Sequence, residues 1–510
     1  MRYNLTFLIV ILLIVFSSCR KDFTSTLSSG GELTFSKDTV YLDTVFTNIG
    51  TSTYNLKVYN KSGNDISIPT IALGRGENSF YRLNVDGIPG KSFENVEILA
   101  KDSIFIFIET TIDYNNVVNP IYIDSIVFNS TQIEQNVKLV TLVEDANFLF
   151  PSKSSDGIIE TIKTGIDDDG SDITVQGFYL GDNTTFTNNK PTVIYGYCAV
   201  PEDKTLTIEA GARIHFHANS GLIVDKNATL TIEGELDNQV ILEGDRLEPY
   251  FTDVPGQWGT IWLRAGSKNN NIENAIIKNA SIGVIIDSIG SVTEPALTLK
   301  NTQIYNSSNY GLLGRQTNIY GENVVINNSG LISLACTIGG NYNFTHSTFA
   351  NYWSSSLREY PSVLINNYYS YYNENGTEIY VVSDLNQANF TNCIIDGNSN
   401  IELLIDKIEG SQFNYDFKNN LIRFNDYNNN YEGIAEYNFE DTTHFLNNII
   451  NGEADFKNSS ENELIIGENS EANGNALETA SNLIPLDILG VTRTIPADIG
   501  AYQHITFEEE

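Results

Sequence analysis

Basic residues are scarce in this sequence. Lys and Arg together number 29 against 64 Asp and Glu, so the 510-residue chain carries a formal net charge of −35. Because a surface this acidic repels phosphate backbones, we expect no nucleic-acid partner. The charge balance fits a soluble protein outside the cytoplasm, or one that holds cations.

Cysteine is scarce as well. The four residues are Cys19, Cys198, Cys336 and Cys393. Cys19 stands apart, next to an N-terminal signal, and the other three form an odd set without the spacing of a metal site. We therefore expect no disulfide framework. Cys393 lies inside a repeat and is interpreted as a small buried hydrophobic residue.

Long apolar runs are missing beyond the N-terminal segment. There, Arg2 precedes an apolar run from Leu5 to Phe16 that is interrupted only by Thr6. The run is too short for a comfortable membrane span and has the layout of a signal peptide, which we assign to residues 1–18. Residues 19–30 are polar and fit a flexible tether.

The residues after this run, Ser17-Ser18-Cys19, resemble a bacterial lipobox, although Phe16 replaces the usual Leu. The resemblance implies that Cys19 carries lipid, that the membrane is a partner through this lipid, and that the protein is anchored at the outer membrane. The alternative is a plain secretory signal with a chance cysteine. Arg20-Lys21-Asp22 partly resembles the signal that sends some Bacteroidota lipoproteins to the cell surface, so the surface and the periplasmic face both stay open.

A helical apolar stripe is also missing, and a short pattern repeats instead. A polar residue, usually Asn, is followed after two positions by Ile or an aromatic residue, at spacings of 27, 22, 23, 20, 26, 27 and 28 residues. The instances begin at Asn274, Asn301, Asn323, His346, Asn366, Asn392, Asn419 and Asn447. Such a period predicts a solenoid with one coil per repeat, and the short alternating strands make the coils β. We predict a right-handed single-stranded parallel β-helix of about ten coils, with an ordinary antiparallel sandwich as the alternative.

The fold class is therefore all-β, with a different domain before the solenoid. Residues 31–145 hold strands with period-2 alternation separated by turn signals, which predicts an immunoglobulin-like β-sandwich. We place a linker and solenoid cap at 146–190, the β-helix at 191–480, and a C-terminal closing strand and tail at 481–510.

Several segments of the solenoid carry a family resemblance. They are Gly211-Ala-Arg-Ile-His-Phe-His217, Gly244-Asp-Arg-Leu-Glu248, Pro255-Gly-Gln-Trp-Gly-Thr-Ile-Trp262 and the closing Pro496-Ala-Asp-Ile-Gly-Ala-Tyr502. They resemble Bacteroidota envelope lipoproteins with a pectate-lyase-like right-handed parallel β-helix. The resemblance implies an architecture and leaves the chemistry open, because one fold hosts many functions.

Two places in the early coils are candidate ligand-binding sites. His215 and His217 would share one strand face and could act as metal ligands or as an acid and a base, or they could be ordinary outward polar residues. The segment Glu243–Gly259 is too long for a coil corner and brings Arg246, Tyr250 and Trp258 beside acids. Rings and carboxylates are what a sugar-binding surface uses. Trp258 could instead plug the stack, with Tyr250 and Arg246 exposed.

Two further patterns concern ions and modification. The acidic loop with Asp167, Asp169 and Asp172 has oxygen ligands at alternate positions and could hold Ca²⁺, or it could be a solvated turn; no other cofactor is expected. Asp-Ser/Thr followed by an aliphatic residue or Thr resembles the acceptor for O-linked glycans on exported Bacteroidota proteins. The central residues are Thr39, Thr44, Ser103, Ser125, Ser288 and Thr442, and ordinary strand-edge composition would explain them equally.

Enzymatic chemistry has little local support. A polysaccharide lyase on this fold needs clustered carboxylates and a base, and a glycoside hydrolase needs two carboxyls close together. Acids in the repeats do not recur at one register, so we expect a binding or structural protein that displays the β-helix wall to a glycan, with a polysaccharide or another envelope protein as partner. A polysaccharide lyase or a glycoside hydrolase is the alternative.

Overall fold

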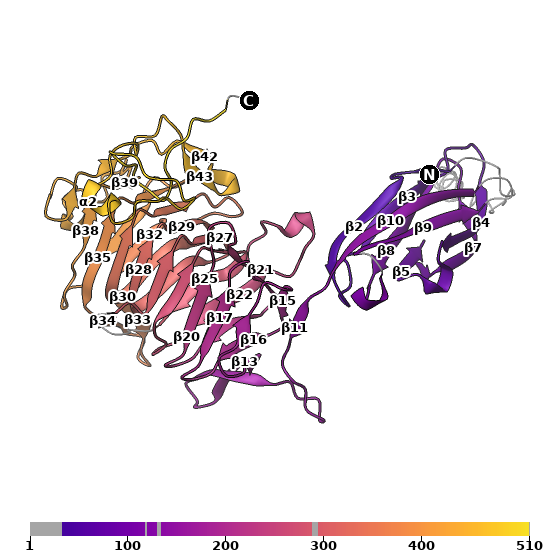
Figure 1. Cartoon of the computed structure of the whole chain (residues 1–510), viewed down its shortest axis with the longest axis horizontal. Helices are drawn as coiled ribbons and strands as arrows, with labels where there is room; N and C mark the ends of the chain where they lie inside the picture. The colour runs from indigo at the N-terminus through magenta and orange to yellow at the C-terminus, as the bar shows by residue number, and fades with distance from the viewer. Residues whose placement is uncertain (1–32, 118–119, 130–133, 288–293, 509–510) are drawn as a thin grey trace, which may run out of the picture. The chain divides into compact units, whose positions relative to one another are not determined.

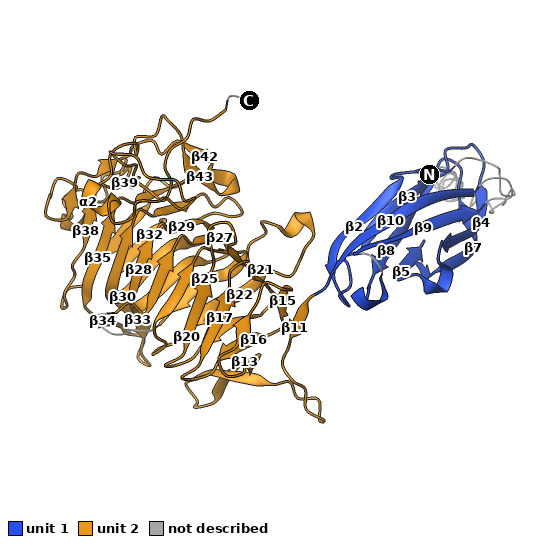
Figure 2. Cartoon of the chain, in the orientation of Figure 1, with its two compact units in different colours: residues 1–145 blue, residues 146–510 orange. Residues whose placement is uncertain are grey.

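The computed structural model describes residues 33–117, 120–129, 134–287 and 294–508. The predicted signal peptide and tether, Cys19 and Ser288 lie outside these residues. The chain is all-β and divides into two compact units, residues 1–145 and 146–510 (Figure 2). No helix in the described ranges has the length and apolar character needed to cross a membrane.

Unit 1 consists of two five-stranded sheets around one core. The first sheet has the order β1 (Thr34–Phe35), β3 (Tyr54–Tyr59), β8 (Ser103–Thr110), β5 (Tyr81–Val85), β6 (Ile88–Gly90). The second has the order β2 (Thr39–Phe46), β10 (Glu134–Glu144), β9 (Ile121–Asn129), β4 (Ile66–Leu73), β7 (Ser92–Ile98). Buried and exposed residues alternate along these strands, as in β8, because successive side chains point to opposite faces.

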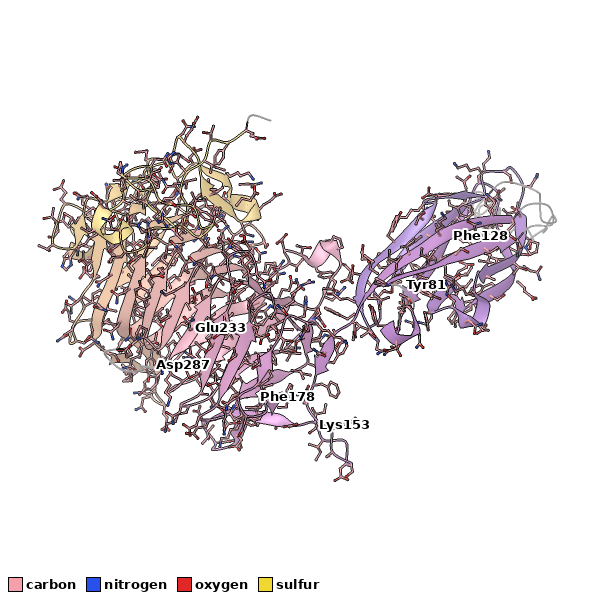
Figure 3. All side chains as sticks on the ribbon, in the orientation of Figure 1. Tyr81, Phe128, Lys153, Phe178, Glu233 and Asp287 are labelled. Atoms are coloured by element: carbon pink, nitrogen blue, oxygen red, sulfur yellow. The ribbon has the colours of Figure 1, made fainter. Side chains whose placement is uncertain are left out.

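The core of unit 1 is apolar with one buried carboxylate. Tyr81 and Phe128, labelled in Figure 3, are both almost fully buried. Asp124 is buried as well, and it accepts hydrogen bonds from the Ser79 hydroxyl at 2.5 Å and the Arg75 amide at 3.1 Å. Donors of the protein thus satisfy oxygens of this buried carboxyl group.

Unit 2 is a stack of coils, and in each coil the chain passes in turn through three walls that are built of parallel strands (Figure 1). Wall 1 contains β13 (Asp172–Tyr179), β16 (Tyr197–Val200), β19 (Gly221–Val224), β22 (Trp258–Leu263), β25 (Ala280–Ile286), the first halves of β28 (Tyr310–Glu322) and β30 (Ile332–Thr345), β32 (Val363–Asn366) and β37 (Leu403–Asp406). Wall 2 contains β14 (Thr185–Phe186), β17 (Thr205–Glu209), β20 (Thr229–Glu233), β23 (Asn270–Glu273), β26 (Leu297–Lys300), the second halves of β28 and β30, β35 (Leu385–Thr391), β38 (Asp416–Lys418) and β40 (Phe445–Leu446). Wall 3 contains β11 (Asn147–Leu149), β15 (Thr192–Ile194), β18 (Arg213–Phe216), β21 (Val240–Gly244), β24 (Ala275–Lys278), β27 (Gln303–Ser307), β29 (Val325–Ser329), β31 (Thr348–Asn351), β36 (Ile394–Gly397), β39 (Leu421–Ile422) and β41 (Ile449–Ile450).

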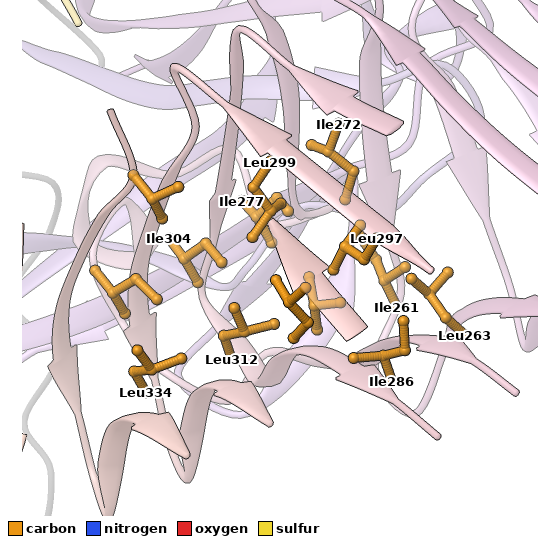
Figure 4. Close-up of a cluster of buried hydrophobic side chains, with 14 of the residues drawn as sticks. Ile261, Leu263, Ile272, Ile277, Ile286, Leu297, Leu299, Ile304, Leu312 and Leu334 are labelled. Atoms are coloured by element: carbon orange, nitrogen blue, oxygen red, sulfur yellow. The ribbon is translucent and has the colours of Figure 1, made fainter. Parts of the chain in front are cut away.

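The three walls enclose a continuous apolar core, shown in part in Figure 4. On wall 3 the inward residues stack one above the other: Ile277 is in register with Ile304, and Ile304 with Ile326. All three are fully buried. Stacking of like side chains at the strand spacing of about 4.8 Å explains why the sequence repeats an Ile or an aromatic residue.

The repeating Asn, with His346 in its place before β31, marks the corner before each wall 3 strand from β24 to β41. Asn274, Asn301, Asn323, His346, Asn392, Asn419 and Asn447 all adopt left-handed backbone conformations, with φ between 47° and 56°. Each amide nitrogen from Asn274 to Asn419 donates to a carbonyl of the following coil, at 2.8–3.2 Å. Asn is selected here because its short side chain tolerates this conformation.

Asn366 does not belong to this set, although its local sequence matches. It ends β32 on wall 1, and the chain then leaves the stack in an antiparallel hairpin of β33 (Tyr368–Tyr372) and β34 (Glu378–Val382). On wall 3, β31 pairs directly with β36. The coil expected at Asn366–Tyr369 is therefore an insertion. The residues from His346 to the next corner, Asn392, form a single long coil.

The C-terminal segment lies against the outer face of wall 3. It contains β42 (Phe456–Asn458), β43 (Glu463–Ile466) and the short helix α2 (Glu478–Ser481). Leu464, Ile488 and Tyr502 pack on Tyr305 and Val325 of wall 3, while Ile466, Ala472 and Ile499 pack on Ile394 and Leu421. The sequence led us to expect a closing strand at 481–510, whereas this segment covers the flank of the stack.

Candidate functional site

The two candidate histidines lie in different environments. His215 is fully buried, and its Nδ1 lies 3.1 Å from the Gly244 carbonyl. Burial lowers the pKa of its imidazole, against the opposing effect of Glu243. His217 follows β18, has a side chain that is 46% exposed, and pairs with Asp245 at 2.7 Å. Neighbouring groups cover His215, so only His217 of the two candidate residues reaches solvent.

The segment Glu243–Gly259 folds as a projecting loop with a buried end. Trp258 is 1% exposed, stacks on Phe216 at 4.3 Å between ring centroids, and donates its indole N–H to the Lys278 carbonyl at 2.9 Å. This packing makes Trp258 a core residue, in agreement with the alternative that it plugs the stack, and its role as a ligand-binding residue stays a prediction. Tyr250, in the short 3₁₀ turn Pro249–Phe251, is 81% exposed.

Arg246 is occupied within the same loop. Its Nη2 lies 2.9 Å from Glu248 Oε1, and its guanidinium lies 3.8 Å from the centroid of the Phe251 ring. Stacking on an aromatic face and pairing with a carboxylate both fix the side chain. Arg246 and Tyr250 therefore form the tip of the loop.

A groove of about 870 Å³ lies beside this loop, on the outer side of wall 1. It crosses successive strands of the wall, from Gln176 on β13 through Tyr197 on β16 to Thr260 on β22 and Ile282 on β25. Its remaining lining includes Pro151, Lys153, Ile159, Tyr195, His217, Ala218, Asn219, Gln257, Ser281 and Asn309. Lys153 belongs to the arm that projects before β12 (Thr161–Ile166), as Figure 3 shows.

The Tyr197 ring forms part of the floor, and two glycines make room for it. A Cβ at Gly221 would lie 2.5 Å from Tyr197 Cε1, and a Cβ at Gly259 would lie 2.1 Å from the Tyr197 hydroxyl oxygen. Real Cβ atoms do not come that close to other heavy atoms. The Tyr197 ring can lie across the backbone of the next two coils because both glycines lack a side chain. Glycine inside a strand often marks such a close approach.

Aromatic and hydrogen-bonding groups surround this floor. Tyr195 stacks on the His217 ring at 4.4 Å between centroids, and burial together with the charge of Asp245 raises the pKa of Tyr195 to about 12. Burial also raises the pKa of Tyr197. Both phenols therefore stay protonated near neutral pH and can donate hydrogen bonds.

Carboxylates are missing from the described lining of the groove. The lining residues that can carry a positive charge are Lys153 and His217. Asp245, which lies outside the lining, pairs with His217. The amides of Gln176, Asn219 and Asn309 supply paired donors and acceptors. Such a surface can stack a ring and exchange hydrogen bonds with hydroxyl groups.

The acidic loop at 167–172 is a tight turn between β12 and β13. The Asp167 carboxylate accepts hydrogen bonds from the amides of Asp169 and Ser171 at 3.1 and 3.0 Å, and Asp172 pairs with Lys163 at 2.5 Å. Within the described ranges no three His, Cys, Asp or Glu gather as metal ligands. Asp167 and Asp169 thus accept hydrogen bonds from amides of their own turn, while Asp172 pairs with Lys163.

The candidate O-glycosylation residues lie at the surface where the structure describes them. Thr39, Thr44, Ser103 and Ser125 are half-buried in strands of unit 1, and Thr442 is exposed in a turn of unit 2. Their modification stays a prediction.

The later coils contain two buried carboxyls that the sequence did not single out. Glu402 and Arg358 are both buried and approach to 2.6 Å, and Asp396 accepts a hydrogen bond from Tyr352 at 3.1 Å. Burial raises the pKa of Glu402 to about 7 despite its contact with Arg358. Glu402 accepts hydrogen bonds from the backbone amides of Ser399 in its own turn and of Ser362, 40 residues earlier, and Asp396 accepts one from Gly397. Both carboxyls thus hold backbone segments together.

Sequence reasoning found His217 and the adjoining loop but missed most of the groove. The pair Tyr195 and Tyr197, the residue Gln257 and the residue Lys153 come from three separate segments, so no local motif unites them. The available signal was a glycine inside a strand pattern at Gly221 and again at Gly259.

Comparisons with known proteins add little to this picture. No protein-family model matches the chain, and no curated protein matches it. A solved structure of a family 123 glycoside hydrolase from Clostridium perfringens aligns with 22% of this chain and 25% of its own, at 10% identity and a TM-score of 0.17. A likeness this slight supports no statement about fold or activity.

Proposed function

We propose that the protein is a lipid-anchored, glycan-binding protein of the outer membrane, and that the groove on wall 1 is its binding site. In this proposal unit 1 is an immunoglobulin-like sandwich and unit 2 a right-handed parallel β-helix, as in the Bacteroidota envelope lipoproteins that the sequence resembles. Cys19 carries the lipid. The observation that carries the binding function is the Tyr197 ring lying over Gly221 and Gly259.

Aromatic floors suit sugars for a physical reason. The C–H face of a sugar ring is apolar and packs on an aromatic ring, while its hydroxyls need donors and acceptors at the edges. Here amides and hydroxyls of Gln176, Asn219 and Thr260 surround Tyr197. The groove also crosses several strands, which are spaced by about 4.8 Å, so it accommodates an extended chain better than a single ring.

Affinity electrophoresis of the full-length protein against a panel of polysaccharides tests this proposal. For a retained ligand, we expect Asn219→Gly combined with Gln176→Ala to weaken binding at least tenfold. Glycine is chosen at position 219 because the backbone there is left-handed, with φ 60°. The matched control is Asn269→Gly, at an exposed residue of equivalent backbone conformation, with φ 52°.

The loop tip provides the competing binding site. If Tyr250→Ala or Arg246→Ala abolishes retention while the groove variants do not, the ligand binds at the tip and the groove assignment is wrong. If the wild-type protein binds no polysaccharide of the panel, the glycan-binding function itself is refuted.

The His217–Asp245 pair favours one alternative, a polysaccharide lyase. A His oriented by a carboxylate beside a Tyr can move a proton, which is what an elimination requires. Hydrolysis by two carboxyls is less well supported, because the described lining of the groove contains none. Unsaturated products, detected by their ultraviolet absorbance, would establish the lyase.

A further inference from the structure

A second groove lies in unit 1, at the edge where its two sheets end. It has a volume of about 660 Å³ and is lined by β6, β7 and the turn that leads into β8. Core side chains form its base, among them Val85, Phe93, Ile98 and Ile104. The groove therefore opens directly onto the apolar layer between the sheets.

Strand β7 borders this groove with an open edge. In the part of the chain that the structure describes, β7 pairs with β4 alone and ends its sheet. Every second peptide group of such a strand points away from its partner and can bond to a further strand, here on either side of Asn95, whose left-handed backbone (φ 53°) interrupts the pairing with β4. On the opposite sheet the edge strand β6 is short and contains Pro89, which has no amide hydrogen to donate. An added strand would thus pair with β7.

The rim of this groove is acidic. Asp86, Glu94, Glu97 and Asp102 line it, and no Lys, Arg or His is among the described lining residues. The nearby Lys91 is turned away, with its ammonium 2.7 and 2.8 Å from the carbonyls of Glu77 and Ser79. A second copy of this chain would bring the same carboxylates opposite each other, which disfavours self-pairing through β7.

We propose that this groove binds an extended, basic segment of a partner protein, which adds to the sheet as a strand beside β7. Apolar side chains on one face of that strand would fill the groove above Val85 and Ile104, and Lys or Arg on its other face would meet Glu94 and Glu97. Backbone pairing gives the affinity, and the alternation of apolar and basic residues gives the specificity. This surface is independent of the glycan groove in unit 2.

The test uses the full-length protein and a ten-residue peptide of alternating lysine and valine. Two control peptides are an alternating glutamate–valine sequence and a peptide of the same lysine and valine content with the residues in blocks. We expect only the alternating basic peptide to bind, with hydrogen–deuterium exchange slowed in Ser92–Ile98 and not in the outer strands β1 and β2.

Charge-reversal variants separate this site from general attraction to an acidic protein. The double variant Glu94→Lys with Glu97→Lys should weaken binding of the alternating basic peptide at least tenfold. The control is Glu77→Lys with Glu134→Lys, which makes an equal change of charge at exposed residues outside the groove. This control should change the affinity for the peptide less than twofold. Equal losses in both double variants, equal binding of the glutamate peptide, or protection outside β7 would overturn the proposal. So would a wild-type protein that dimerises through β7, with protection of β7 that depends on protein concentration.

Discussion

Asn323 donates its side-chain amide to the side-chain oxygen of Asn301 in the preceding coil, at 2.9 Å. The two residues occupy the same corner of successive coils and share a left-handed backbone, with φ 52° and 47°. One residue type thus provides both the corner conformation and a bond between coils, and the two contributions can be separated by mutation.

Asn301→Ala should destabilise unit 2 more than Asn301→Gly. Both variants lose the bond from Asn323, but only alanine is strained at φ 47°, by about 1–2 kcal/mol. Chemical denaturation of both variants measures the difference. If alanine and glycine cost the same, the corner does not depend on the left-handed conformation.

The stacked isoleucines of wall 3 should carry much of the stability of unit 2. Ile326, Ile395 and Ile422 are fully buried, so Ile→Ala at each should cost about 2–5 kcal/mol. Thr298→Ala, at a half-buried residue that alternates with the buried Leu297 and Leu299 of β26, is the control and should cost below about 1 kcal/mol. Denaturant midpoints that shift equally for both classes would contradict this register.

Thr302 and Asn448 are poor controls for the same experiment, although their place in the sequence pattern makes them look outward. Thr302 is fully buried and donates its hydroxyl to the Ile272 carbonyl at 3.1 Å. The Asn448 side chain accepts from Asn420 and donates to the Phe417 carbonyl. Their replacement by alanine should leave buried polar groups without partners, which costs about 1–3 kcal/mol.

His346 should make the stability of unit 2 depend on pH. Burial, helped by the charge of Arg493, holds the pKa of His346 well below 6.5. The unfolded chain therefore takes up a proton near pH 6.5 and the folded one does not, so stability is present above this pH and is lost as the pH falls below it. Between pH 7 and pH 5 the loss should approach about 2 kcal/mol.

His346→Asn provides the matched variant, because Asn occupies this corner in the other coils. This variant should remove the loss of unfolding free energy that His346 causes at low pH, and it should keep the left-handed backbone conformation, whose φ is 48°. Unfolding free energies at pH 5 and pH 7 for both proteins decide the matter. An unchanged difference between the two pH values would show that His346 does not titrate on unfolding.

Ile338 should be a site where a substitution stabilises the protein. It is a β-branched residue at φ 61°, a conformation that costs about 1–2 kcal/mol. Its amide donates to Asn366 Oδ1 at 2.9 Å, a bond that a variant can keep. Ile338→Asn should therefore raise the melting temperature, whereas Ile285→Asn, at a half-buried position without positive φ, should lower it. A lower melting temperature for Ile338→Asn would show that its packing outweighs the strain.

Cys19→Ser tests the proposed anchor. Loss of the lipid should move the protein from the membrane fraction to the soluble fraction, because acyl chains supply nearly all of the membrane affinity. Metabolic labelling with a palmitate analogue should mark the wild type and not the variant. An unlabelled wild type would refute the anchor.

The repeat was predictable from sequence because its cause is local. A corner that needs a left-handed residue, followed by an inward Ile or aromatic residue, recurs in the coils from β24 onward and leaves a pattern at Asn301, Asn323 and Asn392. The same pattern at Asn366 was misleading, since four residues do not reveal whether the strand pairs with the stack or with its own hairpin.

The candidate groove was less predictable, for a different physical reason. Tyr197 meets Gly221 and Gly259 only after two further coils have been added, so its environment depends on the coil lengths between them. Burial of His215 and Trp258 likewise depends on neighbouring coils. The sequence placed the loop near the site and could not identify which of its rings face solvent.

The covering of wall 3 by the C-terminal segment has a consequence for how the protein is made. The chain leaves the ribosome N-terminus first, so the outer apolar residues Tyr305, Val325 and Ile394 are complete long before Ile488, Ile499 and Tyr502 exist to cover them. A chain that stops near residue 450 would contain every strand of the three walls but would leave the outer apolar residues of wall 3 exposed to solvent. Proteases and chaperones that detect exposed apolar surface can thus distinguish a copy that lacks this covering segment from one that carries it.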